Sequence, residues 1–138
     1  MRFLGHVDPE VRNILLAASD FLALPTYQEN FGNAVVEGMA AGLPVLVSDQ
    51  VGICREVEID QAGIVTGVEA DSIAQGLVTL ASQPTQLKEM GRKGRQAAAD
   101  RYSIQSTAKK MERAYLDILE GIQTPDLHWS NKITYERH

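Results

Sequence analysis

Cysteine is nearly absent from this sequence, which has only Cys54 among its 138 residues. A single thiol cannot form an intramolecular disulfide, and no Cys/His spacing here suits zinc. We expect Cys54 to be a small buried apolar side chain, because no sequence feature would lower its pKa. The composition fits a reducing compartment and predicts a cytoplasmic protein, with peripheral attachment to the inner face of a membrane left open.

Long apolar runs are also missing. Runs such as 14–18 and 43–47 fall far short of the roughly 20 residues that a membrane-spanning helix needs. Residues 1–5 lack the apolar region and cleavage site of a signal peptide and lead almost directly into a predicted strand. We therefore expect no transmembrane segment, and we interpret the start of the chain as a point inside a domain.

Positive charge is not in excess, because 13 lysines and arginines face 18 acidic residues and the formal net charge is −5. A protein that binds nucleic acid through its phosphates needs a broad cationic surface, so nucleic acid is excluded as the expected partner. The basic residues that do cluster are interpreted as a solvated helix face; they are Lys88, Arg92, Lys93 and Arg95.

The chain has the length of one domain, and its 44% hydrophobic content is enough to bury a core. No internal repeat or low-complexity tract interrupts it. We predict one domain over residues 1–121, followed by a polar, loosely held tail over 122–138.

Strands and helices are predicted to alternate along the chain. Short apolar runs bounded by glycine or proline predict strands at 3–5, 20–24, 44–48 and 63–66. Helical spacing of apolar residues, with caps at Asp8, Gly42, Asp71 and Ser103 and prolines at first turns, predicts helices at 9–18, 32–41, 54–57, 71–81, 84–99 and 103–121. The order predicts an α/β fold in three layers, with a parallel sheet of about four strands and additional C-terminal helices.

The best candidate site follows the second predicted strand. Ligands of open α/β sheets bind outside the carboxyl ends of the strands, and the segment 25–32 leaves this end. Gly32 and Asn33 open the next helix, whose free backbone N–H groups and positive dipole end suit a diphosphate.

Two glutamates flank this turn. Glu29 precedes the helix, and Glu37 lies about one turn inside it, away from the apolar stripe of Val35, Val36 and Met39. Ionised carboxylates only accept hydrogen bonds, so they suit the hydroxyl groups of a sugar rather than phosphate. Taken singly, each glutamate is more typical of a solvated surface, and it is the combination that predicts a site.

The segment Pro25-Thr26-Tyr27-Gln28-Glu29-Asn30-Phe31-Gly32, followed by Glu37-Gly38-Met39-Ala40-Ala41-Gly42-Leu43-Pro44-Val45, resembles the E-x7-E region of the family-4 retaining glycosyltransferases, which are group 1 glycosyl transferases. Gly52, Glu56 and Gly63-Ile64-Val65 are also similar to the end of that family's second domain. The resemblance covers about residues 1–120. It implies the C-terminal, Rossmann-like half of a GT-B fold, which binds a nucleotide-sugar donor.

The resemblance also implies roles for single residues. Glu29 would be the catalytic-site carboxylate that binds hexose hydroxyls, and Glu37 would bind the ribose hydroxyls of the donor nucleotide. The remaining donor-binding positions would be Asn30, Phe31, Gly32, Asn33 and Val36, with backbone groups of Phe31, Gly32 and Asn33 at the diphosphate and sugar. The substrate would be a nucleoside-diphosphate sugar, with no cofactor and no metal, and the sequence has no Asp-x-Asp signature to hold one.

Other parts of the family pattern lie upstream of anything corresponding to Met1. These are the Arg/Lys pair that clamps the diphosphate, the acceptor-binding first domain and the first strands of the donor domain. Loss of such cations removes electrostatic stabilisation of the transition state, so we expect negligible transfer of a hexose-like sugar by this chain alone. We expect the first predicted strand to move beside 20–24, or another chain, including a second copy, to cover that open sheet edge.

Two other interpretations stay open from the residues. One is a non-catalytic sugar-nucleotide-binding or assembly module, and the other is an active site of the GT-B epimerase type. No residue can be paired with a base edge, so the sequence selects neither the nucleotide base, the sugar nor the acceptor.

Overall fold

The computed structural model describes residues 2–120, which fall into two compact units. The first unit extends to Ser103 and the second begins at Ile104. The predicted boundary between 121 and 122 and the predicted polar tail lie outside the described residues.

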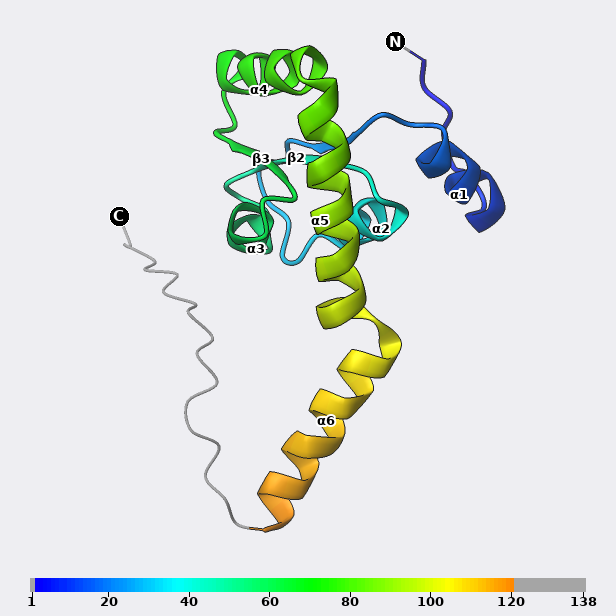
Figure 1. Cartoon of the computed structure of the whole chain (residues 1–138), viewed down its shortest axis with the longest axis vertical. Helices are drawn as coiled ribbons and strands as arrows, with labels where there is room; N and C mark the ends of the chain where they lie inside the picture. Colours follow the sequence, from blue (N-terminus) through cyan, green and yellow to red (C-terminus); the bar gives the residue numbers. More distant parts are fainter. Residues whose placement is uncertain (1, 121–138) are drawn as a thin grey trace. The chain divides into compact units, whose positions relative to one another are not determined.

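A parallel sheet forms the centre of the first unit, which confirms the predicted α/β class (Figure 1). Strand β1 (Leu22–Leu24) pairs with β2 (Val45–Ser48), and β2 pairs with β3 (Gly63–Thr66), in the order β1-β2-β3. All four residues of β2 are buried, as expected for the central strand of a parallel sheet that is covered on both faces.

The predicted first strand at 3–5 is wrong. These residues form no strand, the Phe3 side chain is 85% exposed, and the described sheet has three strands rather than about four. A three-residue segment that buries no apolar side chain gains too little to offset the entropy of fixing its backbone. The prediction that this segment would move beside 20–24 is also wrong, because within the described residues β1 pairs with β2 alone.

Helices cover both faces of the sheet and give the predicted three layers. On one face, Val45 and Val47 of β2 share a core with Met39 of α2 (Asn33–Ala41) and Val57 of α3 (Cys54–Ile59). The same core includes Ala97 and Ala98 of α5 (Pro84–Tyr102). On the other face, Gly76 of α4 (Ala70–Ser82) lies against Leu46, whose side chain points away from Val45 and Val47 because strand residues alternate.

Two of the four predicted caps, Asp8 and Gly42, are confirmed. Asp8 accepts a 2.9 Å hydrogen bond from the Val11 amide at the start of α1 (Pro9–Ala17), and Gly42 ends α2 in the left-handed conformation with φ of 85°. The predicted cap Asp71 lies instead inside the first turn of α4, after the N-cap residue Glu69. Near the start of α4, the Ser72 hydroxyl accepts a hydrogen bond from the Gly67 amide. The side chain that binds the backbone before the helix is therefore that of Ser72, one residue after the predicted Asp71.

The second unit contains α6 (Ile104–Leu119), of which no residue is buried. Two of its apolar side chains, Ile104 and Leu119, are more than four-fifths exposed. Arg113 and Asp117 form an ion pair of 2.8 Å one turn apart along it. Between residues 2 and 120, the structure has no helix that is both long and apolar enough to cross a membrane.

Candidate donor-binding site

The loop that follows β1 is attached to the loop that follows β2. The Glu29 amide donates to the Gln50 carbonyl at 3.2 Å, and the Gly52 amide donates back to the Glu29 carbonyl at 2.8 Å. The Ile53 amide donates to the Phe31 carbonyl at 3.2 Å. Both loops leave carboxyl ends of adjacent parallel strands, so these bonds hold Glu29 at the sheet edge where ligands of such folds bind.

Two small residues allow the two loops to approach each other closely. A Cβ atom on Gly52 would collide with the carbonyl group of Asn30, so the two backbones can approach only because Gly52 has no side chain. Ser48, fully buried at the end of β2, donates its hydroxyl to the Thr26 carbonyl. These contacts were not predicted from the sequence. Gly52 was named only in the family resemblance, and Ser48 only as the end of a predicted strand.

Glu29 and Phe31 lie next to each other in the loop. The Glu29 Oε1 atom accepts a 3.3 Å hydrogen bond from the Phe31 amide, and the Phe31 ring is 41% exposed. Tyr102, at the end of α5, meets the Phe31 ring edge to face with centroids 5.7 Å apart. Burial raises the pKa of the Tyr102 phenol. Sequence reasoning missed Tyr102, because nothing local predicts that a helix end so far along the chain reaches this loop.

The first turn of α2 provides backbone donors. Gly32 precedes it in the left-handed region with φ of 101°, and an added Cβ would come within 2.9 Å of Val51. The Val35 and Val36 amides donate to the Gly32 carbonyl, at 2.9 and 3.2 Å. The amides of Asn33 and Ala34, ahead of these two in the described first turn, are therefore available to a ligand or water. The helix starts at Asn33, one residue later than predicted.

Glu37 lies on the partly exposed side of α2 and has a partner that the sequence did not reveal. Arg12 of α1 donates from Nη1 to Glu37 Oε1 at 2.9 Å, with the two side chains 44% and 43% exposed. Val35 and Met39 of the predicted apolar stripe are fully buried. Val36, one of the predicted donor-binding residues, is partly buried against the core, and Asn30 and Asn33 are exposed.

The structure thus places Glu29, Asn30, Phe31, Gly32 and Asn33 on one loop and helix start, with Val36 and Glu37 on the helix that follows. No cluster of three or more His, Cys, Asp or Glu side chains that could hold a metal ion occurs within residues 2–120. The groups available to a ligand here are backbone amides, two carboxylates and one aromatic ring. This set suits a ligand that combines phosphate with neutral hydroxyl groups.

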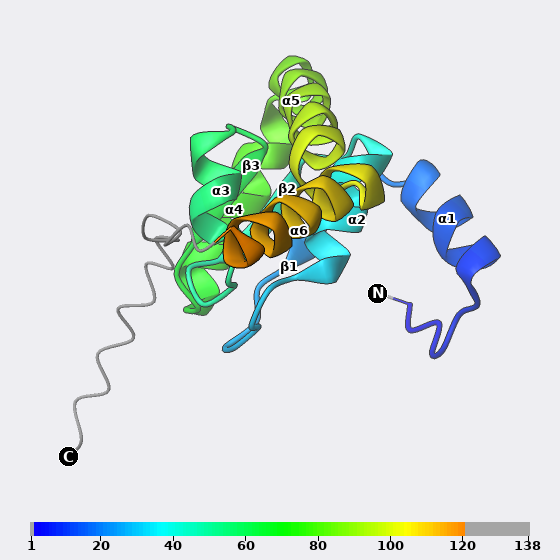
Figure 2. The same cartoon turned by 90° about the horizontal axis from the view of Figure 1, so that it is seen from below.

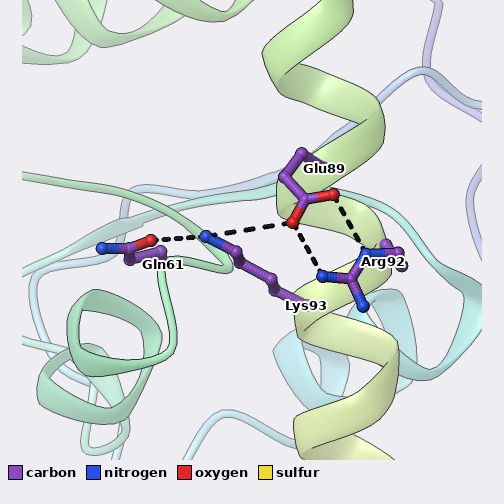
Figure 3. A network of polar contacts seen from close by, with 4 residues as sticks. All are labelled: Gln61, Glu89, Arg92 and Lys93. Carbon is purple, nitrogen blue, oxygen red and sulfur yellow. Dashed lines mark hydrogen bonds and ion pairs between the residues drawn. The ribbon is translucent and has the colours of Figure 1, made fainter.

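A second polar network lies on α5, where the sequence predicted a basic cluster. Arg92 forms hydrogen bonds of 3.0 and 2.7 Å to both oxygens of Glu89, and Lys93 reaches Gln61 Oε1 at 2.5 Å (Figure 3). The hydrogen bond from Arg92 holds the pKa of Glu89 below its ordinary value. Two surface hollows along α5, of about 340 and 490 Å³, are lined by members of this network and by neither Glu29 nor Glu37. Because the cations already have acidic or amide partners, the network does not resemble an anion site.

Cys54 begins α3 beside the loop that follows β2. Its thiol donates to the Asp49 carbonyl at 3.5 Å and is partly buried against the core. Burial is the main cause that raises the pKa of the thiol, with further contributions from the charges of Glu56 and Asp49. The side chain is thus less buried than expected, whereas its raised pKa agrees with the absence of any sequence feature that would lower it.

We expect Cys54 to react with iodoacetamide more slowly at pH 8 in the folded protein than in the same chain unfolded in urea. The thiolate is the reactive form, and a raised pKa lowers its fraction until the pH passes the folded-state value. Mass spectrometry of the alkylated protein against time, repeated from pH 7 to pH 10, measures both rates. Equal rates in the folded and unfolded chain would contradict the prediction.

Solved structures with this arrangement are glycosyltransferases of the GT-B fold. Sucrose-phosphate synthase from Thermosynechococcus elongatus matches with a TM-score of 0.78 and 24% identity, over 87% of this chain and 30% of that one. WaaG, a glycosyltransferase involved in lipopolysaccharide biosynthesis, matches with a TM-score of 0.61 and 26% identity, over 67% of this chain and 25% of that one. The fold of this chain is therefore that of the GT-B glycosyltransferases.

The family follows from the sequence match. The profile of the glycosyl transferases group 1 matches residues 1–97. A D-inositol 3-phosphate glycosyltransferase of Rhodococcus erythropolis is 32% identical over 114 residues, which are 82% of this chain and 26% of that relative. The chain belongs to the group 1 glycosyl transferases, and it spans about a quarter of the length of this curated relative.

Proposed function

We propose that this chain is the donor-binding part of a retaining glycosyltransferase of the E-x7-E type. The enzyme would transfer a hexose-like unit from a nucleoside diphosphate to an acceptor, breaking the bond between the anomeric carbon and the diphosphate. The observation that carries the proposal is the attachment of the Glu29 loop to the loop after β2, immediately before the open first turn of α2. This arrangement offers carboxylates and amides at one edge of a parallel sheet.

The two carboxylates and the amides have separate tasks in this proposal. Glu37 accepts hydrogen bonds from the ribose hydroxyls, and Glu29 accepts them from the hexose. The backbone around Phe31, Gly32 and Asn33 faces the diphosphate and sugar, where the amide groups and helix dipole favour negative charge. Asn30 and Val36 complete the donor-binding set, with Val36 supplying apolar surface.

The donor-binding part is expected to bind without catalysing transfer. Amides of one helix turn stabilise only part of the charge that develops on a departing diphosphate, and each missing donor commonly costs about 3 kcal/mol of transition-state stabilisation. The 138 residues alone are therefore expected to show negligible transfer, and to depend on a partner domain or chain for the acceptor and for further cations. We place the whole enzyme in carbohydrate biosynthesis in the cytoplasm, in line with the lone thiol, Cys54.

Calorimetric titration with UDP, GDP and ADP and with their glucose or mannose conjugates tests the proposal. In a Glu29→Gln variant, we expect affinity for the nucleotide sugar to fall about tenfold while affinity for the free nucleotide stays unchanged. The reason is that Glu29 contacts only the sugar in this proposal. Glu58→Gln, at an exposed position of α3, is the matched control.

The results of this titration decide the site clearly. A folded wild-type chain that binds none of these compounds would disprove the donor-site assignment. An equal loss of affinity for nucleotide and nucleotide sugar in Glu29→Gln would contradict the proposed contact between Glu29 and the hexose.

A second candidate function is a non-catalytic binding or assembly module. It is favoured by β1, whose second edge has no strand partner within the described residues. Such an edge can pair with another chain, including a second copy of this one. Sedimentation velocity at increasing protein concentration tests the assembly role, because a strictly monomeric protein would show that this edge does not pair with a second copy.

A further inference from the structure

We infer that Arg12 is a positioning residue for Glu37, which holds the carboxylate in its ribose-binding orientation before a nucleotide arrives. The inference rests on the proposed role of Glu37. Arg12 is not part of the motif that points to the site, and its helix, α1, precedes β1 in the chain.

The ion pair with Arg12 holds one oxygen of the Glu37 carboxylate and leaves the other oxygen able to accept hydrogen bonds from a ligand. Arg12 Nη1 donates to Glu37 Oε1 at 2.9 Å, while Oε2 accepts no hydrogen bond from the described part of the chain. A carboxylate offers about four acceptor positions, so the ion pair uses a minority of them. With 43% of its side chain exposed, Glu37 stays accessible to a pair of vicinal hydroxyls.

The guanidinium itself is restrained on more than one side. Nη2 lies 3.4 Å from the Asn13 side-chain oxygen, and Nε is shielded from solvent without a hydrogen-bond partner. The end of the Arg12 side chain is therefore partly shielded, while the side chain as a whole is 44% exposed. The contacts with Glu37 and Asn13 restrict where the guanidinium can lie.

A structural role alone explains the ion pair poorly. Helix α1 has no buried residue, and its apolar side chains Val11 and Ile14 are 40% and 67% exposed. Figures 1 and 2 both show that α1 lies beside α2, on the side away from the sheet. Half-exposed ion pairs contribute little to stability, so this one is better suited to ordering a side chain than to holding the fold.

Preorganisation gives the pair an effect on binding. A glutamate that is free on a helix surface must lose rotamer freedom when it binds ribose, which weakens affinity by about two- to tenfold per side chain. When Arg12 already holds Glu37, most of that loss occurs before binding. The effect is specific to the ribose hydroxyls, since the guanidinium pairs with the carboxylate and not with the diphosphate.

The test compares each nucleoside diphosphate with its 2′-deoxy counterpart, using UDP, GDP and ADP with the full chain in calorimetric titration. The measured quantity is the ratio of the two dissociation constants, which reports contacts to the 2′-hydroxyl. We expect Arg12→Ala to lower the preference for the ribonucleotide about three- to tenfold. Arg12→Lys should keep part of it, because lysine retains the charge but not the planar fork.

Two further variants separate positioning from general damage. Arg12→Ala in a Glu37→Gln background should cause no additional loss of preference, since the carboxylate to be positioned is gone. Arg92→Ala, which removes an exposed ion pair with Glu89 elsewhere, should leave the preference unchanged. Thermal unfolding of each variant checks that the protein stays folded.

Three results would overturn the inference. They are an unchanged preference in Arg12→Ala, an increased preference, which would mean that Arg12 competes with ribose, and equal losses for ribo- and deoxyribonucleotides. If the folded wild type binds no nucleotide at all, the proposed function fails as well. If the wild type prefers the ribonucleotide and Arg12→Ala does not alter that preference, only the inference fails.

Discussion

Replacing Glu37 by glutamine is expected to weaken the binding of both nucleoside diphosphates and nucleotide sugars by about 10- to 100-fold. Hydrogen bonds to a charged acceptor contribute roughly 1.5–3 kcal/mol, and glutamine offers only a neutral carbonyl and a donor in the same place. Because Glu37 is proposed to contact ribose, which both compounds share, both affinities should fall together. Calorimetric titration measures this.

The effect of Glu37→Gln on folding must be measured as a control for its effect on binding. The pair with Arg12 is half exposed, so its loss should change the free energy of unfolding by no more than about 1 kcal/mol. Urea denaturation of the variant measures that quantity. If Glu37→Gln binds nucleotides with wild-type affinity, Glu37 is not part of the binding site. Glu29→Gln, in contrast, is expected to leave the affinity for free nucleotide unchanged.

Replacing Gly91 by alanine is expected to lower the free energy of unfolding by about 2–3 kcal/mol, the upper part of the range for overpacking. A Cβ at this buried position of α5 would collide with the backbone carbonyl group of Gly42, which ends α2. The backbone cannot rotate away as a side chain can, so α5 must separate from α2. The gain in helix propensity on replacing glycine, about 1 kcal/mol, offsets only part of this.

Gly94 provides the matched control on the same helix. It is also buried, but the atoms nearest to an added Cβ would be side-chain atoms of Ala62 and Met39, at 3.3 to 3.5 Å. We therefore expect Gly94→Ala to stay within about 1 kcal/mol of the wild type, because helix propensity and slight crowding oppose each other. Urea denaturation of both variants decides the matter, and a Gly91→Ala protein as stable as Gly94→Ala would contradict the close approach of α2 and α5.

Local patterns predicted most elements of the first unit. The apolar runs at 44–48 and 63–66 became β2 and β3 almost unchanged, because Pro44 and Gly63 bound them. All residues of the central strand β2 are buried, whereas those of β3 are mostly half-buried. The end of α2 was predicted from Gly42, since a left-handed cap strongly favours glycine. Such features depend on a few neighbouring residues.

The errors arose where local pattern lacked tertiary support. Residues 3–5 have the composition of a strand, but Phe3 is exposed and no strand lies beside them in the described structure. Asp71 has a side chain suited to capping, but the backbone enters α4 earlier, at Ala70. For residues 3–5 the outcome depended on what the segment packs against, which strand propensity does not describe.

The candidate site shows the same division. The sequence by itself determined the order of the elements, the turn at Gly32 and the spacing that sets Glu29 before α2 and Glu37 within it. Only the tertiary structure decided that Arg12 pairs with Glu37, that Tyr102 meets Phe31, and that Gly52 admits the neighbouring loop. The reason is physical: turns and periodicity depend on adjacent residues, whereas ion pairs, ring contacts and close backbone approaches depend on how distant elements pack.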